Sequence, residues 1–258
     1  MMGFFNKLKK DRPDKIGGYI EYHGLTEWWL SSFSEDERDH IVKTFKPMGS
    51  SGEVLIRGNF DFINQSPSRL LFDLAGWFKT KENRTIAFRL IGKAEELLNE
   101  NSDILDVHFF YSNKINMYYK HREVEPEALA IAIEACKKQI AIAPKAKKAF
   151  MDEQQAELPT GYKPEYRRVR LSDEEYKKQL AEAGGDKSKV SRSEIVPWSD
   201  DQEIPLPSHL GFEQLAIIEE KQGNYEETIK LSKEALKQGW RGDWEKRIER
   251  CMKKINEG

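Results

Sequence analysis

The chain has 258 residues, of which 33% are charged and 38% are hydrophobic, a balance that suits thin helical layers better than one thick core. Its 42 basic and 44 acidic side chains give a net charge of −2, which offers no support for a broadly basic nucleic-acid-binding surface. No apolar run approaches the ~20 residues of a membrane-spanning helix. Cys136 and Cys251 lie far apart in the sequence without nearby metal-ligand partners, which favours a reducing compartment and predicts a cytoplasmic protein of bacterial type.

Residues 1–14 form a flexible or amphipathic N-terminus in this interpretation. The opening MMGFFNKLKK lacks the apolar core of a secretory signal, but it combines Phe4, Phe5 and Leu8 with lysines. Such a segment can contact an anionic membrane weakly, and one short turn supplies little binding energy. A frayed terminus, or a helix packed on the body, is the expected alternative.

Residues 15–66 are expected to form a small α+β cap rich in aromatic side chains. Helices are predicted over Thr26–Ser32 and Ser34–Phe45, and Ser34 with Glu37 has the spacing of a capping box. The adjacent Trp28 and Trp29 have two interpretations, a binding platform or buried core, and the core is the more common outcome. A hairpin of two short strands is expected at residues 53–57 and 60–63.

Residues 67–144 are predicted to form two helical hairpins. In the first, from about Arg69 to Asn99, apolar residues recur at helical spacing on both sides of a polar turn at residues 81–83. The second runs from Ile104 to Pro144, with Pro126 near the start of its second helix, and Pro144 is expected to end that helix.

Residues 145–206 interrupt this series and are expected to be an irregular insertion with one helix. The helix is predicted over Asp173–Ala183, with Ser172 and Glu175 as a capping box and Gly184 as a stop. An excursion this long between hairpins indicates either disorder or a functional loop that regulates access to a binding site. Both alternatives remain open at the sequence level.

Residues 207–258 are predicted to form a third hairpin followed by a C-terminal capping helix. The stretch Gly211–Trp240 resembles a tetratricopeptide repeat, with Phe212, Leu215-Ala216, Gly223, Tyr225 and Ala235 in register. The first two hairpins match the pattern less completely. The resemblance implies a stack of antiparallel helical hairpins, mainly α in class, that acts as a non-catalytic scaffold for binding proteins.

The resemblance also implies where a partner peptide or helix would bind. In such proteins, side chains of the first helix of each hairpin line a groove. Carrying the register over to this sequence gives a candidate partner-binding set: Arg69, Phe72, Asp73, Lys79, Asn113, Lys114, Met117, Lys120, Glu213, Ile217 and Glu220.

Enzymatic motifs do not emerge from the sequence. Gly92-Lys93 is followed by Ala94 within a predicted helix, so it is not a phosphate-binding loop, and the five histidines are scattered. We therefore expect no catalytic residues, no cofactor and no metal. One alternative function is a nucleic-acid-associated protein that uses Tyr166–Arg170, where three arginines follow an aromatic residue, although flanking acidic residues would repel phosphate. The oligomeric state and the identity of a partner are not predicted.

Overall fold

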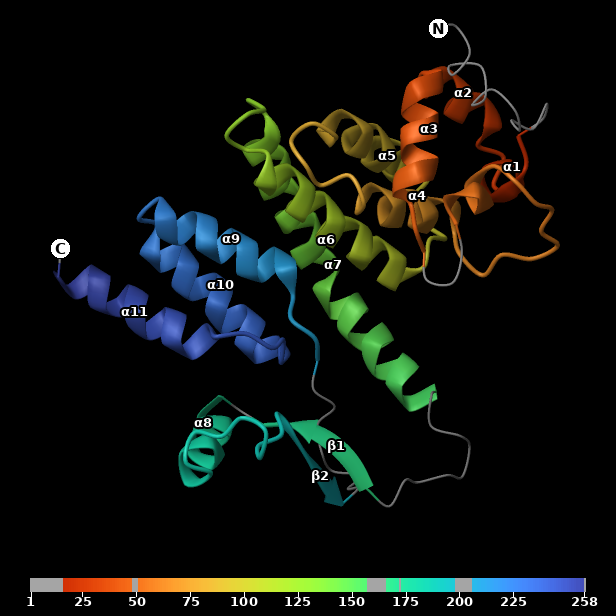
Figure 1. Cartoon of the computed structure of the whole chain (residues 1–258). Helices are drawn as coiled ribbons and strands as arrows, with labels where there is room; N and C mark the ends of the chain where they lie inside the picture. The colour runs from red at the N-terminus through yellow and green to blue at the C-terminus, as the bar shows by residue number, and fades with distance from the viewer. Residues whose placement is uncertain (1–15, 48–50, 157–165, 172, 198–205, 258) are drawn as a thin grey trace, which may run out of the picture. The chain divides into compact units, whose positions relative to one another are not determined.

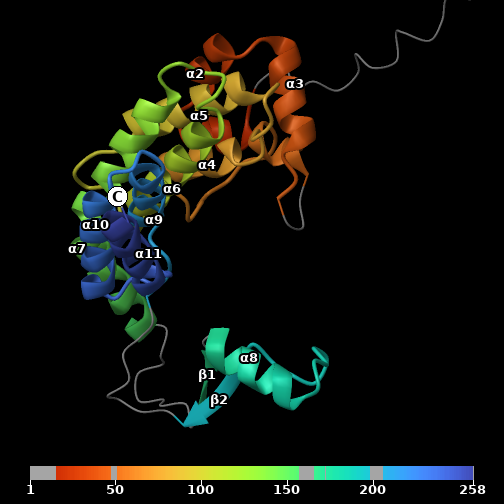
Figure 2. The same cartoon turned by 90° about the vertical axis from the view of Figure 1, so that its left-hand side faces the viewer.

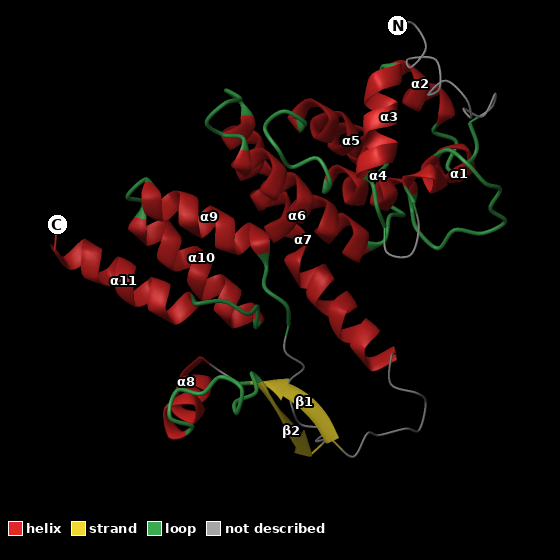
Figure 3. Cartoon of the chain, in the orientation of Figure 1, coloured by secondary structure: helices red, strands yellow, loops and turns green. Residues whose placement is uncertain are grey.

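The computed structural model describes residues 16–47, 51–156, 166–171, 173–197 and 206–257 (Figure 1). The chain divides into two compact units, the first made of Met1–Ala146 with Ser208–Gly258 and the second of Lys147–Pro207. The described residues are mainly helical, as the sequence predicts, and their two strands belong to the second unit (Figure 3). Among these described residues, no helix combines the length and the hydrophobicity needed to cross a membrane.

The first described segment contains three short helices, α1 (Gly18–Tyr22), α2 (Thr26–Ser32) and α3 (Glu35–Thr44). The capping box that the sequence predicts before α3 is confirmed. The Ser34 hydroxyl accepts from the Glu37 amide at 3.2 Å, and the Glu37 carboxylate accepts from the Ser34 amide at 2.8 Å. Such a cap contributes about 1 kcal/mol to helix stability.

The two strands expected at residues 53–57 and 60–63 are wrong. A short 3₁₀ helix, η1 (Gly52–Leu55), stands in place of the first, and the residues of the second are irregular. The main-chain bonds explain the difference, because Gly17 donates to the Ile56 carbonyl at 2.9 Å and Gly18 to the Gly58 carbonyl at 2.8 Å. The carbonyls of this segment are therefore used by the start of α1 and not by a strand partner.

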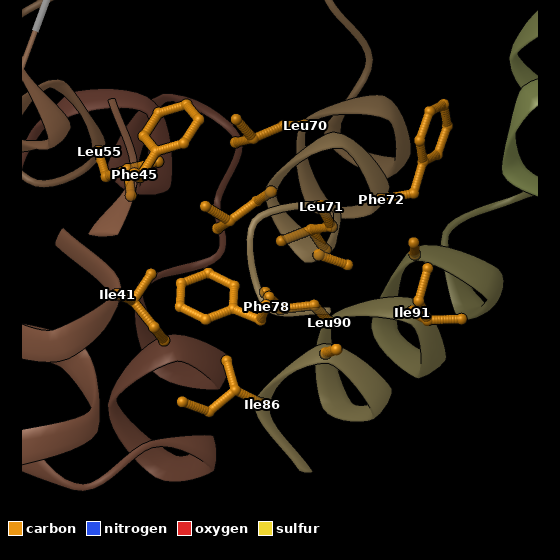
Figure 4. Close-up of a cluster of buried hydrophobic side chains, with 14 of the residues drawn as sticks. Ile41, Phe45, Leu55, Leu70, Leu71, Phe72, Phe78, Ile86, Leu90 and Ile91 are labelled. Atoms are coloured by element: carbon orange, nitrogen blue, oxygen red, sulfur yellow. The ribbon is translucent and has the colours of Figure 1, made fainter. Parts of the chain in front are cut away.

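A hydrophobic core joins this N-terminal segment to the helices that follow (Figure 4). Phe78 is fully buried near Ile41 of α3, and Leu90 lies beside it from α5 (Arg84–Glu96). Trp29 is also fully buried, so for this tryptophan the core interpretation is confirmed. The N-terminal segment is consequently part of the first unit and shares its core.

Helices are present at the residues of all three predicted hairpins. The first consists of α4 (Pro67–Ala75) and α5, and the second of α6 (Ile104–Lys120) and α7 (Ala128–Ala156). The third consists of α9 (Leu210–Lys221) and α10 (Tyr225–Gln238), followed by α11 (Trp244–Glu257). Helix α6 packs against α4 and α5 on one side and against α9 on the other, and Figures 1 and 2 both show α9 alongside α6.

The third hairpin has the turn that its sequence predicts. Gly223 adopts a φ of 82° between α9 and α10, and Gly239 adopts a φ of 85° after α10. Both values lie in the left-handed region, where a residue without Cβ pays little penalty. These two glycines set the ends of α10.

The expected helix end at Pro144 is wrong. Helix α7 continues through Pro144 to Ala156. Proline removes one main-chain hydrogen bond and crowds the carbonyl four residues earlier, but it does not prevent the following turns from forming when neighbouring residues hold the helix. Ala143 and Ala146, on either side of Pro144, are both fully buried in the first unit and supply that support.

The second unit contains more than the single helix expected for the insertion. Helix α8 (Asp173–Glu182) lies where the sequence predicts it, and Gly184 follows with a φ of 64°. Strand β1 (Tyr166–Arg170) pairs antiparallel with β2 (Ser193–Pro197), with Arg168 opposite Ile195. Ser172, the predicted cap of α8, lies outside the described residues.

Candidate functional site

Helices α4 and α6 are joined by a cluster of polar side chains that includes two predicted site residues. Arg69 pairs with Asp106 at 2.9 Å, and the Ser66 hydroxyl donates to the other oxygen of Asp106 at 2.7 Å. Asp73 lies 3.7 Å from Arg69 and accepts from the Gln65 amide at 3.0 Å. Burial raises the pKa of Asp73, while the nearby Arg69 opposes that change. Arg69 thus compensates the buried Asp106 and also leaves half of its own side chain exposed.

An exposed stripe runs along α6, next to this cluster. Phe109, Asn113, Asn116 and Lys120 follow one another at helical spacing, and each is exposed or partly exposed. The Arg69 guanidinium lies 5.8 Å from the centre of the Phe109 ring, which links the stripe to α4. Asn113 and Lys120 belong to the predicted set, whereas Phe109 and Asn116 were missed although the same spacing identifies them.

Two predicted site residues are buried, so their assignment to an open groove is wrong. Phe72 is 1% exposed and its ring centre lies 6.2 Å from that of Phe110; Met117 is 3% exposed. Both belong to the core that α4 and α6 share with the N-terminal segment. The repeat register does not anticipate this, because the additional N-terminal helices cover a face that the pattern treats as open.

Lys114 lies on a different side of α6 from the exposed stripe. Its ammonium group is 2.5 Å from the Glu95 carboxylate on α5 and 6.0 Å from the ring centres of Phe110 and Tyr118. Burial, and then the negative charge of Glu95, raise the pKa of Tyr118. The pKa of Tyr111 is raised for the same two reasons and by Glu134 on α7.

A surface depression of about 400 Å³ opens beside Lys114. Most of its lining is on α7, where small and aliphatic side chains form the floor and charged side chains form the rim. Ile131 is partly exposed and Ala135 is buried, which leaves an apolar strip one helical turn long between charges of both signs. The lining residues are Lys114, Glu127, Ala130, Ile131, Glu134, Ala135 and Lys138.

The three predicted site residues of α9 differ in their exposure and contacts. Glu213 is exposed and Ile217 is partly exposed, as a partner-binding role requires. Glu220 instead binds α11, with Arg247 at 2.8 Å and Arg250 at 2.6 Å. The hydrogen bond from Arg250 is the main cause that lowers the pKa of Glu220. Glu220 therefore holds the C-terminal helix.

Lys79, the remaining predicted residue, is exposed in the connection between α4 and α5. The structure thus divides the predicted set among the α4–α6 cluster, the stripe on α6, the Lys114 depression, the surface of α9 and the core. It brings Arg69 and Asp73 together but does not assemble all eleven residues into one site.

The side chains at these candidate sites make apolar contacts and ion pairs. Within the described ranges, no group of three or more histidine, cysteine, aspartate or glutamate side chains is placed to hold a metal ion. A second hollow, of about 300 Å³, lies at the starts of α4 and α6, where Ser66 and Asp103 cap the two helices. The Ser66 hydroxyl and the Asp103 carboxylate accept hydrogen bonds from the first main-chain amides of α4 and α6.

Comparisons of the chain with protein-family models, with curated proteins and with solved structures found no match.

Proposed function

We propose that this chain is a non-catalytic protein-interaction module in which the three hairpins form a tetratricopeptide-like stack. The support is the succession of first helices, because α4 packs on α6 and α6 packs on α9. A close approach between α7 and α9 adds to it: a Cβ at Gly211 would lie 2.9 Å from the Cys136 carbonyl. In a stacked-repeat protein each hairpin contacts its neighbours in this way.

The depression beside Lys114 is the proposed partner site, and its lining is the observation that carries the proposal. An apolar floor with a charged rim suits one face of an amphipathic helix, whose apolar side chains cover Ile131 and Ala135 while its charges meet the rim. Glu127, Glu134 and Lys138 are all exposed. A rim of both signs selects the register of the partner as well as its charge.

The first test locates the site by cross-linking. A photoreactive amino acid at Ala130, which is exposed on the depression, is compared with one at Glu249, which is exposed on α11. Proteins captured from the native lysate by the first position and not by the second are candidate partners. Each is then purified and its affinity for the intact chain is measured.

The second test uses charge insertion. We expect Ile131→Glu to weaken a verified partner by at least about tenfold, because a carboxylate would be desolvated on the apolar floor. The matched variant is Asn113→Ala with Lys120→Ala on the exposed stripe of α6, and it should bind as the parent does. A partner that is weakened only by the stripe variant would move the site to α6, as the repeat register implies. Unchanged melting temperatures are the control for folding.

Two further measurements test a regulatory role of the insertion and the nucleic-acid alternative. Replacement of residues 157–205 by a short linker should strengthen partner binding if the insertion regulates access. The segment Tyr166–Arg170 is a strand paired to β2. Retention on DNA or RNA with a steep salt dependence, lost on replacement of Arg167 and Arg168, would favour the alternative over the module.

A further inference from the structure

A buried polar joint holds the third hairpin against the second. Gln139 of α7 is fully buried, and its amide group bonds to both neighbouring helices. Its nitrogen donates to the His108 carbonyl at 2.9 Å and to the Ser112 hydroxyl at 2.6 Å, both on α6. Its oxygen accepts from the Gly211 amide at 2.6 Å, at the start of α9. One side chain thus joins three helices.

Two histidines lie at the same joint. His108 of α6 and His209, which precedes α9, have ring centres 5.0 Å apart, and they are 2% and 0% exposed. Trp240, after α10, stacks on His108 at 5.9 Å and meets His209 edge-on at 4.7 Å. Ser208 and Arg241 form a main-chain bridge beside these rings. The contact between the two hairpins is therefore formed by aromatic rings of which two can gain a proton.

His209 has a second role, because it caps α9. Its Nδ1 accepts from the Phe212 amide at 3.3 Å, which requires that Nδ1 carry no proton. A proton at this nitrogen would remove the cap and place a positive charge at the positive end of the helix dipole. The geometry thus favours the neutral ring.

We propose that the His108–His209 pair makes the attachment of the third hairpin to the second acid-labile. A proton on either ring would bring a positive charge into a buried joint, and the hairpin can relieve it by separating so that the rings meet water. The loss of α9 contacts then exposes the end of the second hairpin. The device acts on the fold itself, and it stands whether or not the proposed partner site is correct.

Among the described residues, burial has the largest effect on the protonation of both rings. Burial lowers the pKa of His108 to about 4. Burial, followed by the charge of His108, lowers the pKa of His209 to about 3, against smaller opposing effects of main-chain hydrogen bonds. On α7, burial raises the pKa of Cys136 to about 12, so this thiol stays neutral. Glu213 of α9 and Arg241, beside Trp240, are exposed.

The sign of the pH effect follows from these shifts. Well above pH 6.5, the ordinary histidine value, both rings are neutral whether the hairpin is attached or separated, and the attachment is at full strength. Between about 6.5 and 4 the separated state binds protons that the attached state does not. The attachment therefore weakens as the pH falls through this range.

The test is hydrogen exchange of the intact chain at pH 7.0 and pH 4.5, with labelling times scaled for the intrinsic effect of pH. We expect α9 and α10 to gain at least about tenfold in exchange rate at pH 4.5 relative to α4 and α5, since one unshifted histidine allows up to about a hundredfold. His209→Asn, which keeps a capping oxygen but cannot titrate, should clearly reduce this gain, while His108 keeps its own share. His40→Gln, at an exposed histidine, should retain it.

Two results would overturn the proposal. One is equal acid acceleration in the parent chain and in His209→Asn. The other is independent of that variant's folding: NMR titration of the parent chain in which the His108 and His209 rings gain protons at an ordinary pKa near 6.5 while α9 stays protected. The proposal is supported if both rings remain neutral down to pH 5 and gain protons only when α9 loses its protection from hydrogen exchange.

Discussion

At the residue scale, the polar side chains that the sequence marks as binding groups are largely used to hold the helices together. Arg69 compensates Asp106, Lys114 pairs with Glu95, and Glu220 binds two arginines of α11. Removing one member of such a partly buried pair leaves the other without its charge partner, which costs more than the pair itself contributes. Alanine variants at these positions therefore report on folding as well as on binding.

Leu215 provides a residue-scale prediction. It is 5% exposed on α9, so Leu215→Ala should lower the free energy of unfolding by about 2–5 kcal/mol through the cavity it leaves. The matched variant Ile217→Ala, two residues away and partly exposed, should cost clearly less. Denaturant melts measure both. A loss below about 0.5 kcal/mol for Leu215→Ala would contradict the packing of α9 described above.

At the element scale, helix α7 departs most from its sequence pattern. Proline in a helix interior costs about 3 kcal/mol relative to alanine, and this cost makes Pro144 a reasonable end point when only local preferences are considered. The helix nevertheless continues to Ala156. Local preference decides helix ends where packing is weak, whereas here the buried residues around Pro144 decide.

Pro144→Ala tests this interpretation. Pro144 is exposed, so the change removes no buried packing, and it restores a main-chain donor within α7. We expect a gain of about 1–3 kcal/mol in the free energy of unfolding, after allowing for the greater freedom of the unfolded chain. Pro126→Ala, just before α7, should give no gain. If Pro144→Ala were destabilising, the helix would not be continuous at this position.

At the scale of the whole molecule, contacts between hairpins matter more than the hairpins themselves. A short helix pair cannot bury its apolar faces alone, so each depends on the next. Glycine makes one of these contacts close: a Cβ at Gly211 would lie 2.9 Å from both the Cys136 carbonyl and the Gln139 side-chain oxygen. The attachment of the third hairpin therefore requires glycine at this position.

Two glycine-to-alanine variants separate this contact from helix propensity. Gly211→Ala should destabilise the chain by about 1–3 kcal/mol, since the added methyl group overpacks the contact. Gly92→Ala, within α5 where a Cβ meets nothing within 4 Å, should stabilise it by about 0.5–1 kcal/mol. Thermal melts with the same baseline chain compare them. Stabilisation by both variants would show that α9 does not approach α7 closely.

The difference between local and long-range information also explains which sequence predictions were correct. Helix α2, the capping box of α3 and the glycine turns of the third hairpin depend on residues within a few positions of one another. Those interactions can be recognised in the sequence because their partners are adjacent in it. The same distinction applies to the candidate site. The exposed stripe on α6 can be predicted from helical spacing, but the depression beside Lys114 cannot, because it depends on α5, α6 and α7 together.

The sequence by itself determined that the described chain is mainly helical, where most helices begin and which turns contain glycine, because helix periodicity, capping and positive φ are local properties. Only the tertiary structure decided that Phe72 and Met117 are buried, that residues 53–57 bond to the start of α1, and that Gln139 joins three helices. Each of these outcomes depends on contacts between segments 31 to 72 residues apart, for which the local sequence carries no signal. A buried polar group needs a hydrogen-bond partner, and which groups are buried is decided only when the hairpins pack against one another.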